Sequence, residues 1–576
     1  MRRNQAPTRE EEEPWLDASL FADLDRCFAR FIARFGGGEK AARAAAFLSR
    51  AVRQGHICLD LAAAPLSDTG EAVPWPPLAE WLTALRPCRA VGSPGAIAVT
   101  PLVLDAAGRL YLRRYFDYEA ALARALRNRV TPSSAPSREG QEAAIETAIT
   151  QPLTVISGGP GTGKTTTVVA ILLRLMQPGA PALRIALSAP TGKAAARLER
   201  TIRDGWTAQG RADLLVAIPR ASTLHRLLGS RRASPQFRHH AANPLALDLL
   251  VVDEASMVPL PLMAKLFAAL PPQARAILLG DRDQLASVDP GNVLADIVDA
   301  AALPGNPLQG TLAVLKKNYR FGNESAIYRL CETVREGRSG EALALLRAQE
   351  TDDLGSAPLP PPQRLAEALR GPVLGGYSAY LRETDPAKAL EAFGRFRVLC
   401  AVRKGAYGVE ELNQRIAALL RDAGLLKGAH PLCAGMPVLI TRNDPQLGLF
   451  NGDIALLLPD PAQIHAPNPP LWAWLPGEGE SPALRRIAPA QLPDHEPAFA
   501  MTVHKSQGSE FDRVLLVLPE RDSPVVTREL IYTGLTRARR RVELWVEQGV
   551  FERGVARRIA RASGLRDRLS ANAECF

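Results

Sequence analysis

A glycine-rich loop near residue 160 carries the strongest chemical signal in the sequence. The run 157–166 reads SGGPGTGKTT and fits the pattern G-x-x-x-x-G-K-[ST], with an apolar strand predicted before it and a helix after it. Glycines let backbone N–H groups curl around phosphate oxygens, and the start of the helix adds a favourable dipole. We therefore expect a phosphate-binding site made by Gly158, Gly159, Pro160, Gly161, Thr162, Gly163, Lys164, Thr165 and Thr166.

Two consecutive carboxylates predict the metal ligand and the base of this site. Lys164 would reach the β- and γ-phosphates of a nucleotide, and the Thr165 hydroxyl would hold Mg²⁺. Asp253 and Glu254 end the apolar strand expected over 249–252, and phosphates and metal ions gather at such strand ends in open α/β sheets. Asp253 would bind Mg²⁺ through water, and Glu254 would orient and deprotonate the attacking water.

Three further side chains could act on the transferred phosphoryl group. Gln284 lies in GDRDQL, after the next expected strand, where a neutral amide can bond to the γ-phosphate or to water without adding negative charge. Arg320 lies in KKNYRF, after the core strands of the first α/β unit, and Arg537 lies in YTGLTRA, far downstream. An arginine supplied by a second domain stabilises the transition state and makes hydrolysis depend on domain closure.

The elements expected around these residues form several domains. Residues 1–130 contain helical patterns and precede a Ser- and Pro-rich linker, and residues 131–345 alternate short apolar strands with helices. This alternation indicates a parallel sheet buried on both faces, and it resumes in 346–427 and 497–576. The stretch 428–496 is rich in Pro, Gly and Asn and predicts a small all-β insert. The expected fold class is therefore α/β.

Composition restricts the class of protein. The chain has 576 residues, which is too long for one hydrophobic core. We find no apolar run of about 18 residues and no secretory signal, so no membrane association is expected. The 7 cysteines include no CxxC pair, and this fits a reducing cytoplasm. A net charge of +10 suits a polyanionic partner.

The order of the motifs resembles that of superfamily 1 helicases. GGPGTGKT, APTGKAAARL, TLHRLLG, LLVVDEAS, GDRDQL, KKNYRF, TVHKSQGSEF and YTGLTRAR follow one another along the chain. Within this superfamily the chain is similar to the RecD family, the alpha subunits of exodeoxyribonuclease V (RecBCD). The similarity rests on FRHHAANPLALDLLVVDEASM, FRVLCAVRKGAYGVEELNQRI and ITRNDPQLGLFNGDIALLL and, more loosely, on AFLSRAV and PLVLDAAGRLYLRRYFDYE.

This resemblance implies two RecA-like P-loop NTPase domains, a helical N-terminal domain that docks onto partner subunits, and an SH3-like β insert in the second motor domain. It assigns Gln141 to the adenine edge and Gln507 to coupling between the nucleotide and the strand path. Segment 236–245 would form a strand-splitting hairpin, by its position alone. DNA contacts are implied for Thr191, Thr223, His225, Thr502 and His504. The arginine-rich C-terminus is expected to be a helix with a solvated face.

The implied activity is that of an ATP-dependent 5′–3′ DNA helicase, the motor subunit of a RecBCD-type helicase–nuclease in double-strand break repair and recombination. ATP and Mg²⁺ are the implied cofactors, and DNA ends with RecB-like and RecC-like subunits are the implied partners. No residue spacing shows the polarity. Two alternatives stay open, namely a stand-alone helicase of the same branch and a structural subunit that binds ATP without moving. Stand-alone helicases of this branch usually carry helix–hairpin–helix modules, which we do not find in the sequence. A structural subunit without motor activity is disfavoured because the sequence keeps Lys164, Glu254, Arg320 and Arg537.

Overall fold

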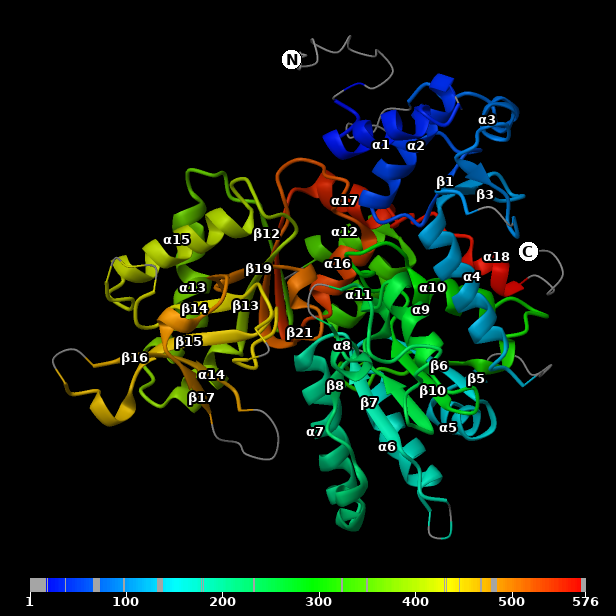
Figure 1. Ribbon diagram of the computed structural model, residues 1–576. Helices are drawn as coiled ribbons and strands as arrows, with labels where there is room; N and C mark the ends of the chain where they lie inside the picture. The colour runs from blue at the N-terminus through cyan, green and yellow to red at the C-terminus, as the bar shows by residue number, and fades with distance from the viewer. Residues whose placement is uncertain are drawn as a thin grey trace, which may run out of the picture.

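Figure 1 shows the computed structural model of the protein, in which an N-terminal domain lies above one α/β domain and a second α/β domain lies to the side. Among the described residues, no helix has both the length and the apolar character needed to cross a membrane. The structure describes residues 17, 19–36, 38–65, 73–96, 99–131, 138–177, 179, 181–231, 234–322, 325–348, 351–428, 430, 432–444, 446–466, 469–477 and 484–570.

The N-terminal domain consists of a helical layer packed on a four-stranded sheet of order β1-β4-β3-β2. Its core surrounds Phe47 and Trp81, which are fully or almost fully buried. Small alanines line the inner face of α2, which allows α1 to pack closely against it. The elements are α1 (Asp23–Ala33), α2 (Gly38–Arg53), β1 (Cys58–Asp60), α3 (Leu78–Leu85), β2 (Val91–Gly92), β3 (Leu102–Leu104) and β4 (Arg109–Leu112).

Helix α4 (Arg113–Arg127) joins this domain to the first motor domain. It packs against α9, and Phe116 and Leu122 belong to the same buried cluster as Leu250 and Met263 of the motor. The boundary expected near residue 130 therefore does not separate two hydrophobic cores. Part of the expected linker, residues 132–137, lies outside the described residues.

The first motor domain is built on a seven-stranded parallel sheet of order β5-β11-β6-β10-β9-β7-β8. Its central strands β6 and β9 are buried along their whole length because helices cover both faces. The strands are β5 (Arg138–Glu139), β6 (Leu153–Gly158), β7 (Ile185–Ala189), β8 (Ser222–Thr223), β9 (Leu249–Val252), β10 (Arg275–Gly280) and β11 (Leu312–Leu315). The helices are α5 (Gln141–Thr150), α6 (Lys164–Leu175), α7 (Gly192–Ala208), α8 (Leu224–Leu228), α9 (Leu260–Ala269) and α10 (Val293–Ala301).

The second motor domain has a five-stranded parallel sheet of order β12-β21-β20-β13-β19. Ile327 and Leu330 of α11 pack with Leu516 of this sheet, so the chain enters the second core before the boundary expected at residue 345. The strands are β12 (Leu354–Pro358), β13 (Phe396–Cys400), β19 (Ala500–Thr502), β20 (Phe511–Val517) and β21 (Ala538–Val546). The helices are α11 (Ala326–Glu336), α12 (Ser339–Arg347), α13 (Leu365–Leu381), α14 (Pro386–Phe393), α15 (Val409–Asp422), α16 (Arg528–Leu535) and α17 (Gln548–Ala556).

An antiparallel five-stranded sheet interrupts the second motor domain between α15 and β19. Its order is β17-β16-β15-β14-β18, and its strands lie where the sequence predicts an all-β insert, apart from the last residue of β18. The SH3-like character of this sheet stays a prediction. The strands are β14 (Pro437–Ile440), β15 (Ile454–Pro459), β16 (Leu471–Leu475), β17 (Arg485–Ile487) and β18 (His495–Pro497).

The C-terminal strap, residues 557–570, leaves the second motor domain and returns to the other two. Figure 1 shows its helix α18 (Leu565–Ser570) beside α4. Glu119 is fully buried and accepts hydrogen bonds from the Ser563 hydroxyl, the Gly564 N–H and the Nε of Arg568. Arg568 is 3% exposed, so the expectation of a solvated C-terminal face was wrong for this residue. Burial of Glu119 requires such a partner.

Candidate nucleotide and DNA site

The phosphate loop connects the end of β6 at Gly158 to the start of α6 at Lys164. Gly161 and Gly163 have φ angles of +80° and +82°, in the left-handed region where side chains are strained. A Cβ atom at Gly163 would also collide with the Gln141 side chain, which begins α5. The loop therefore needs glycine at these positions, and it brings Gln141 against the start of α6.

Lys164 lies within the curl of this loop. Its Nζ donates to the carbonyl oxygens of Gly158 and Gly159 over 2.6 and 3.0 Å, and the Thr162 hydroxyl also donates to Gly159. Burial lowers the pKa of Lys164, and the charges of Asp281 and Glu254 oppose this shift. The ammonium donates to these two neutral carbonyls. Charged phosphate oxygens are stronger acceptors for an ammonium and could replace them.

Asp253 and Glu254 follow β9 as predicted. Burial and the charge of Glu254 raise the pKa of Asp253 to about 6, although Arg197 and Lys164 lower it. A cation bound beside Asp253 would favour the ionised form of this carboxylate. Among the described non-glycine residues, Glu254 is the one with positive φ, 51°, which is a backbone conformation often found at functional sites.

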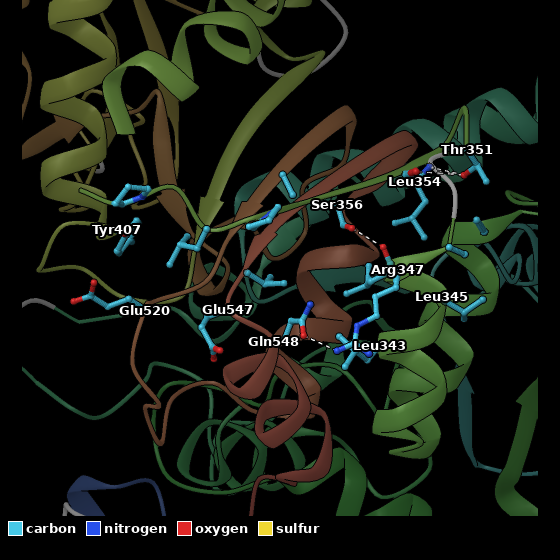
Figure 2. A pocket seen from close by; sticks show the side chains of 18 of the residues that line it. Leu343, Leu345, Arg347, Thr351, Leu354, Ser356, Tyr407, Glu520, Glu547 and Gln548 are labelled. Carbon is cyan, nitrogen blue, oxygen red and sulfur yellow. Dashed lines mark hydrogen bonds between the residues drawn. The ribbon is translucent and has the colours of Figure 1, made fainter. Parts of the chain in front are cut away.

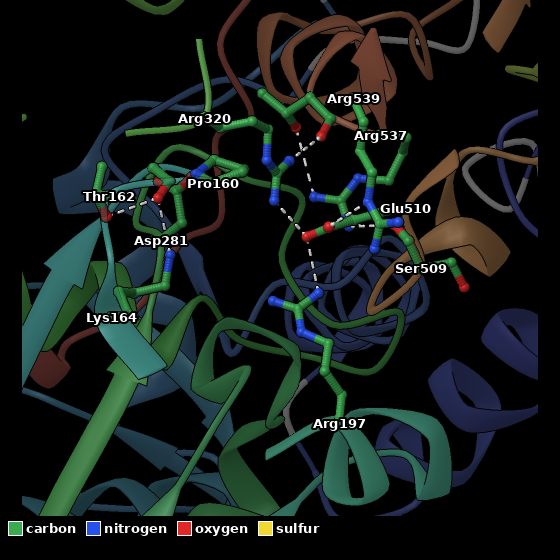
Figure 3. A network of polar contacts seen from close by, with 12 residues as sticks. Pro160, Thr162, Lys164, Arg197, Asp281, Arg320, Ser509, Glu510, Arg537 and Arg539 are labelled. Carbon is green, nitrogen blue, oxygen red and sulfur yellow. Dashed lines mark hydrogen bonds and ion pairs between the residues drawn. The ribbon is translucent and has the colours of Figure 1, made fainter. Parts of the chain in front are cut away.

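The two predicted arginines lie at the contact between the motor domains (Figure 3). Arg537 is almost fully buried, and its Nη2 donates to Gln284 Oε1 over 3.0 Å. Arg320 Nη1 donates to the Thr536 carbonyl over 3.3 Å. Residues from both sheets therefore converge beside the phosphate loop, so the structure brings together Lys164, Gln284, Arg320 and Arg537.

Glu510 joins these arginines, although the sequence reasoning did not select it. Its carboxylate contacts Arg197, Arg320 and Arg539 over 2.8, 2.6 and 3.2 Å. Burial alone would raise its pKa, but Arg197 and Arg320 hold that pKa well below its usual range. Its position inside TVHKSQGSEF was the available signal.

Three more side chains near the loop were not predicted. The Tyr532 hydroxyl donates to Asp281 Oδ2 over 3.1 Å, and a Cβ atom at Gly159 would lie 2.8 Å from that hydroxyl. Tyr319 is 57% exposed, and its N–H donates to the carbonyl of Gly161. Its exposed ring offers a flat surface at the mouth of the loop.

Gln507 contacts the first motor domain at a different point. Its Nε2 donates to the carbonyl of Leu285, the residue after Gln284, over 2.8 Å. The N–H of the same Leu285 donates to the Thr533 hydroxyl. Both contacts cross from the second motor domain to the first. The expected role of Gln507 in coupling stays a prediction.

The predicted DNA contacts lie near the carboxyl ends of strands in both sheets. The hydroxyl oxygens of Thr191, Thr223 and Thr502 each accept a backbone N–H, which leaves the hydroxyl proton free to donate. Burial lowers the pKa values of His225 and His504, which favours their neutral forms. Within the expected hairpin, His240 and Asn243 exchange backbone hydrogen bonds across a tight turn.

A large cavity, of about 720 Å³, lies apart from this site on the second motor domain (Figure 2). Leu343, Leu346, Tyr407 and Val546 line it together with residues of β12, and no predicted site residue does.

Two parallel α/β sheets, with a phosphate loop on one and an arginine of the other bonded to Gln284 of the first, are the architecture of an ATP-dependent superfamily 1 DNA helicase. Family models agree with this class. Residues 141–290 match an AAA domain, residues 497–544 match a UvrD-like helicase C-terminal domain, and residues 17–111 match the N-terminal domain of RecBCD enzyme subunit RecD.

Curated relatives give the family. RecBCD enzyme subunit RecD of Mycobacterium tuberculosis is 38% identical over 92% of this chain and 92% of its own length. The subunit of the same name from Haemophilus influenzae is 33% identical over 87% of this chain and 86% of its own. The ATP-dependent RecD2 DNA helicase of Deinococcus radiodurans is 32% identical over 81% of this chain but 59% of its own. The chain belongs to the RecD family.

Proposed function

We propose that this chain is the 5′–3′ DNA motor of a RecBCD-type helicase–nuclease, working with RecB-like and RecC-like subunits on DNA ends in the cytoplasm. The observation that carries the motor mechanism is the contact of Arg537 with Gln284, because it joins the two motor domains beside the phosphate loop. Hydrolysis of ATP then depends on how the domains meet, which is the requirement for coupling it to movement.

The phosphate loop supplies the binding half of the mechanism. Gly158, Gly161 and Gly163 would present backbone N–H groups to the phosphates, and Lys164 would exchange its carbonyl partners for phosphate oxygens. Thr165 and Asp253 would hold Mg²⁺. When bound, Mg²⁺ supplies positive charge that neutralises the phosphates.

The base would be recognised beside Gln141. The amide of this residue packs against Gly163, and the exposed ring of Tyr319 lies on the same side of the loop. We propose that Gln141 forms hydrogen bonds with the edge of the adenine ring and that Tyr319 stacks on the face of the same ring.

Chemistry would be carried by residues of both domains. Glu254 would take the proton of the attacking water, and Gln284 would orient that water. Arg320 and Arg537 would stabilise the charge on the transferred phosphoryl group. Glu510 would hold Arg320 and Arg197 in place, because its carboxylate contacts both.

Movement along DNA would follow from the contacts that cross between the domains. Gln507 would transmit closure through Leu285 to the strand path. Thr191 and Thr223 of the first domain, with Thr502 of the second, would donate hydroxyl protons to backbone phosphates without reading sequence. Neutral His225 and His504 would add hydrogen bonds rather than charge.

Partner docking is proposed for residues 1–130. This region has its own core around Phe47 and Trp81, and it contains none of the motor motifs. The stand-alone alternative is disfavoured because residues 17–111 match the N-terminal domain of RecBCD enzyme subunit RecD. A purely structural role is disfavoured because the side chains proposed for hydrolysis converge in one place.

Steady-state ATPase assays with and without single-stranded DNA test the motor. We expect single-stranded DNA to stimulate ATP hydrolysis strongly. In a separate experiment, we expect the chain to copurify with RecB-like and RecC-like subunits. ATP binding with neither basal nor DNA-stimulated turnover, in the assembled complex, would instead support the structural role.

A further inference from the structure

A second cavity, smaller than the first and lined by arginines, lies beside the nucleotide site. The two motor domains and the C-terminal strap meet there. The cavity has a volume of about 290 Å³. One water occupies about 30 Å³ in the liquid, so a small oxyanion fits with part of its hydration shell. The lining residues are Arg282, Asp283, Arg335, Arg528, Glu529 and Arg558. Four guanidinium groups thus share one cavity with two carboxylates.

The carboxylates neutralise this cavity incompletely. Glu529 Oε1 lies 3.8 Å from Arg558 Nε, which is too long for a hydrogen bond. Asp283 Oδ1 lies 3.7 Å from Arg282 Nε, also beyond hydrogen-bond range. Arg282 and Arg335 each pair with a carboxylate outside the lining, whereas the Arg558 side chain is 54% exposed and open to a ligand.

One pair of side chains separates this cavity from the phosphate loop. Asp281 Oδ2 accepts the Tyr532 hydroxyl, and its Oδ1 accepts the N–H of Asp283, which lines the cavity. Tyr532 lies one helical turn after Glu529 on α16, and its hydroxyl touches the position of a Cβ atom at Gly159. The pair therefore has the phosphate loop on one side and the basic cavity on the other.

We propose that this cavity is an exit vestibule for inorganic phosphate, entered past the Asp281–Tyr532 pair. The inference rests on the nucleotide site proposed above. After the bond to the γ-phosphate breaks, ADP would still occupy the loop beside Gln141 and Tyr319, and Arg537 would still be bonded to Gln284. A neighbouring cavity whose lining presents guanidinium groups, with Arg558 open to solvent, offers the departing oxyanion charged hydrogen-bond donors.

The test compares cleavage of ATP with release of phosphate in the full chain bound to a single-stranded oligonucleotide. Quenched flow measures cleavage, and a fluorescent phosphate sensor in stopped flow measures release. We expect Arg558→Gln and Arg335→Gln to slow release several-fold and to weaken inhibition by added inorganic phosphate about tenfold, with cleavage unchanged. Arg553→Gln is the control, because its side chain is also 54% exposed but does not line the cavity.

Three outcomes would overturn the proposal. Release and phosphate inhibition equal to those of the Arg553→Gln control, with normal cleavage, would show that the cavity binds no phosphate. Slower cleavage in Arg558→Gln would assign the cavity to the chemical step. Weaker binding of the oligonucleotide by anisotropy, with normal release, would assign it to the DNA backbone. Absence of cleavage in the unaltered protein would instead contradict the nucleotide site itself.

Discussion

Arg537 of the second motor domain donates a hydrogen bond to Gln284 of the first over 3.0 Å. The same guanidinium donates to the carbonyls of Thr533 and Ser509 in its own domain. Hydrogen bonds to both domains therefore hold the Arg537 side chain in place. A side chain proposed to act on the transition state is therefore also part of the contact between the domains.

Arg537→Ala should retain nucleotide affinity but lose turnover by roughly 10³-fold, because an arginine of this kind acts mainly on the transition state. Nucleotide binding by a fluorescent analogue and DNA-stimulated ATPase activity separate the two effects. Arg539→Ala is the control, since its side chain is half-exposed and pairs with Glu510 from the outer side. Lost affinity with retained turnover would make Arg537 a binding residue.

Lys164→Gln should abolish DNA-stimulated hydrolysis while the fold survives, because the change removes a phosphate contact and little volume. Circular dichroism would establish folding before ATPase activity is measured. Lys316→Gln, at a side chain that is 66% exposed, should behave as the unaltered protein. Near-normal turnover in folded Lys164→Gln would contradict the nucleotide-site assignment.

Glu254→Gln should trap ATP with DNA bound, because an amide keeps the hydrogen bonds but cannot accept the proton of water. Filter binding of labelled ATP, followed by analysis of the bound nucleotide, measures this directly. If the variant hydrolyses ATP rapidly, the base is another group, and Asp253 is the next candidate.

Glu510→Gln should lower the free energy of unfolding by about 1–3 kcal/mol at neutral pH, because it leaves the partly exposed Arg197 and Arg320 without their carboxylate. The folded-state pKa of Glu510 is depressed, so its stabilisation is present above the usual pKa of about 4.3 and is lost as pH falls below it. Urea unfolding at neutral and acidic pH should therefore show a difference between variant and parent that shrinks in acid. An equal difference at both pH values would exclude the ionised carboxylate as the cause.

Glu119→Gln should destabilise the protein by roughly 3–5 kcal/mol, because Arg568 would keep a buried charge without its partner. Thermal unfolding measures the effect, and Arg566→Gln, on the exposed side of the strap, provides the control. Equal stability of Glu119→Gln and the control would mean that the strap is not anchored in solution.

Much of the fold follows from local patterns in the sequence. The phosphate loop is predictable because its spacing and its strand–loop–helix context are contained within about twenty residues. The acid pair after β9 and the parallel sheets are predictable because apolar runs of strand length recur between helices. The all-β insert is visible as a break in that alternation.

Contacts between distant segments could not be predicted. Arg568 pairs with Glu119 across 449 positions, and no local pattern distinguishes it from a surface arginine. Glu510 pairs with Arg197 and Arg320, which are far from it in the sequence. Tyr532 was likewise missed, because only the fold brings its hydroxyl close to Gly159. The double packing of α4 before residue 130 was equally hidden, because its apolar face meets partners in both the N-terminal domain and the motor.

Strand displacement on duplexes with a 5′ or a 3′ single-stranded tail tests the central claim most directly. The chain alone, and the chain assembled with RecB-like and RecC-like subunits carrying an inactive RecB-like motor, should unwind the 5′-tailed duplex in an ATP-dependent manner. Lys164→Gln should abolish this unwinding. Unwinding of the 3′-tailed duplex alone would contradict the proposed polarity, and unwinding of neither, by chain or complex, would contradict the motor.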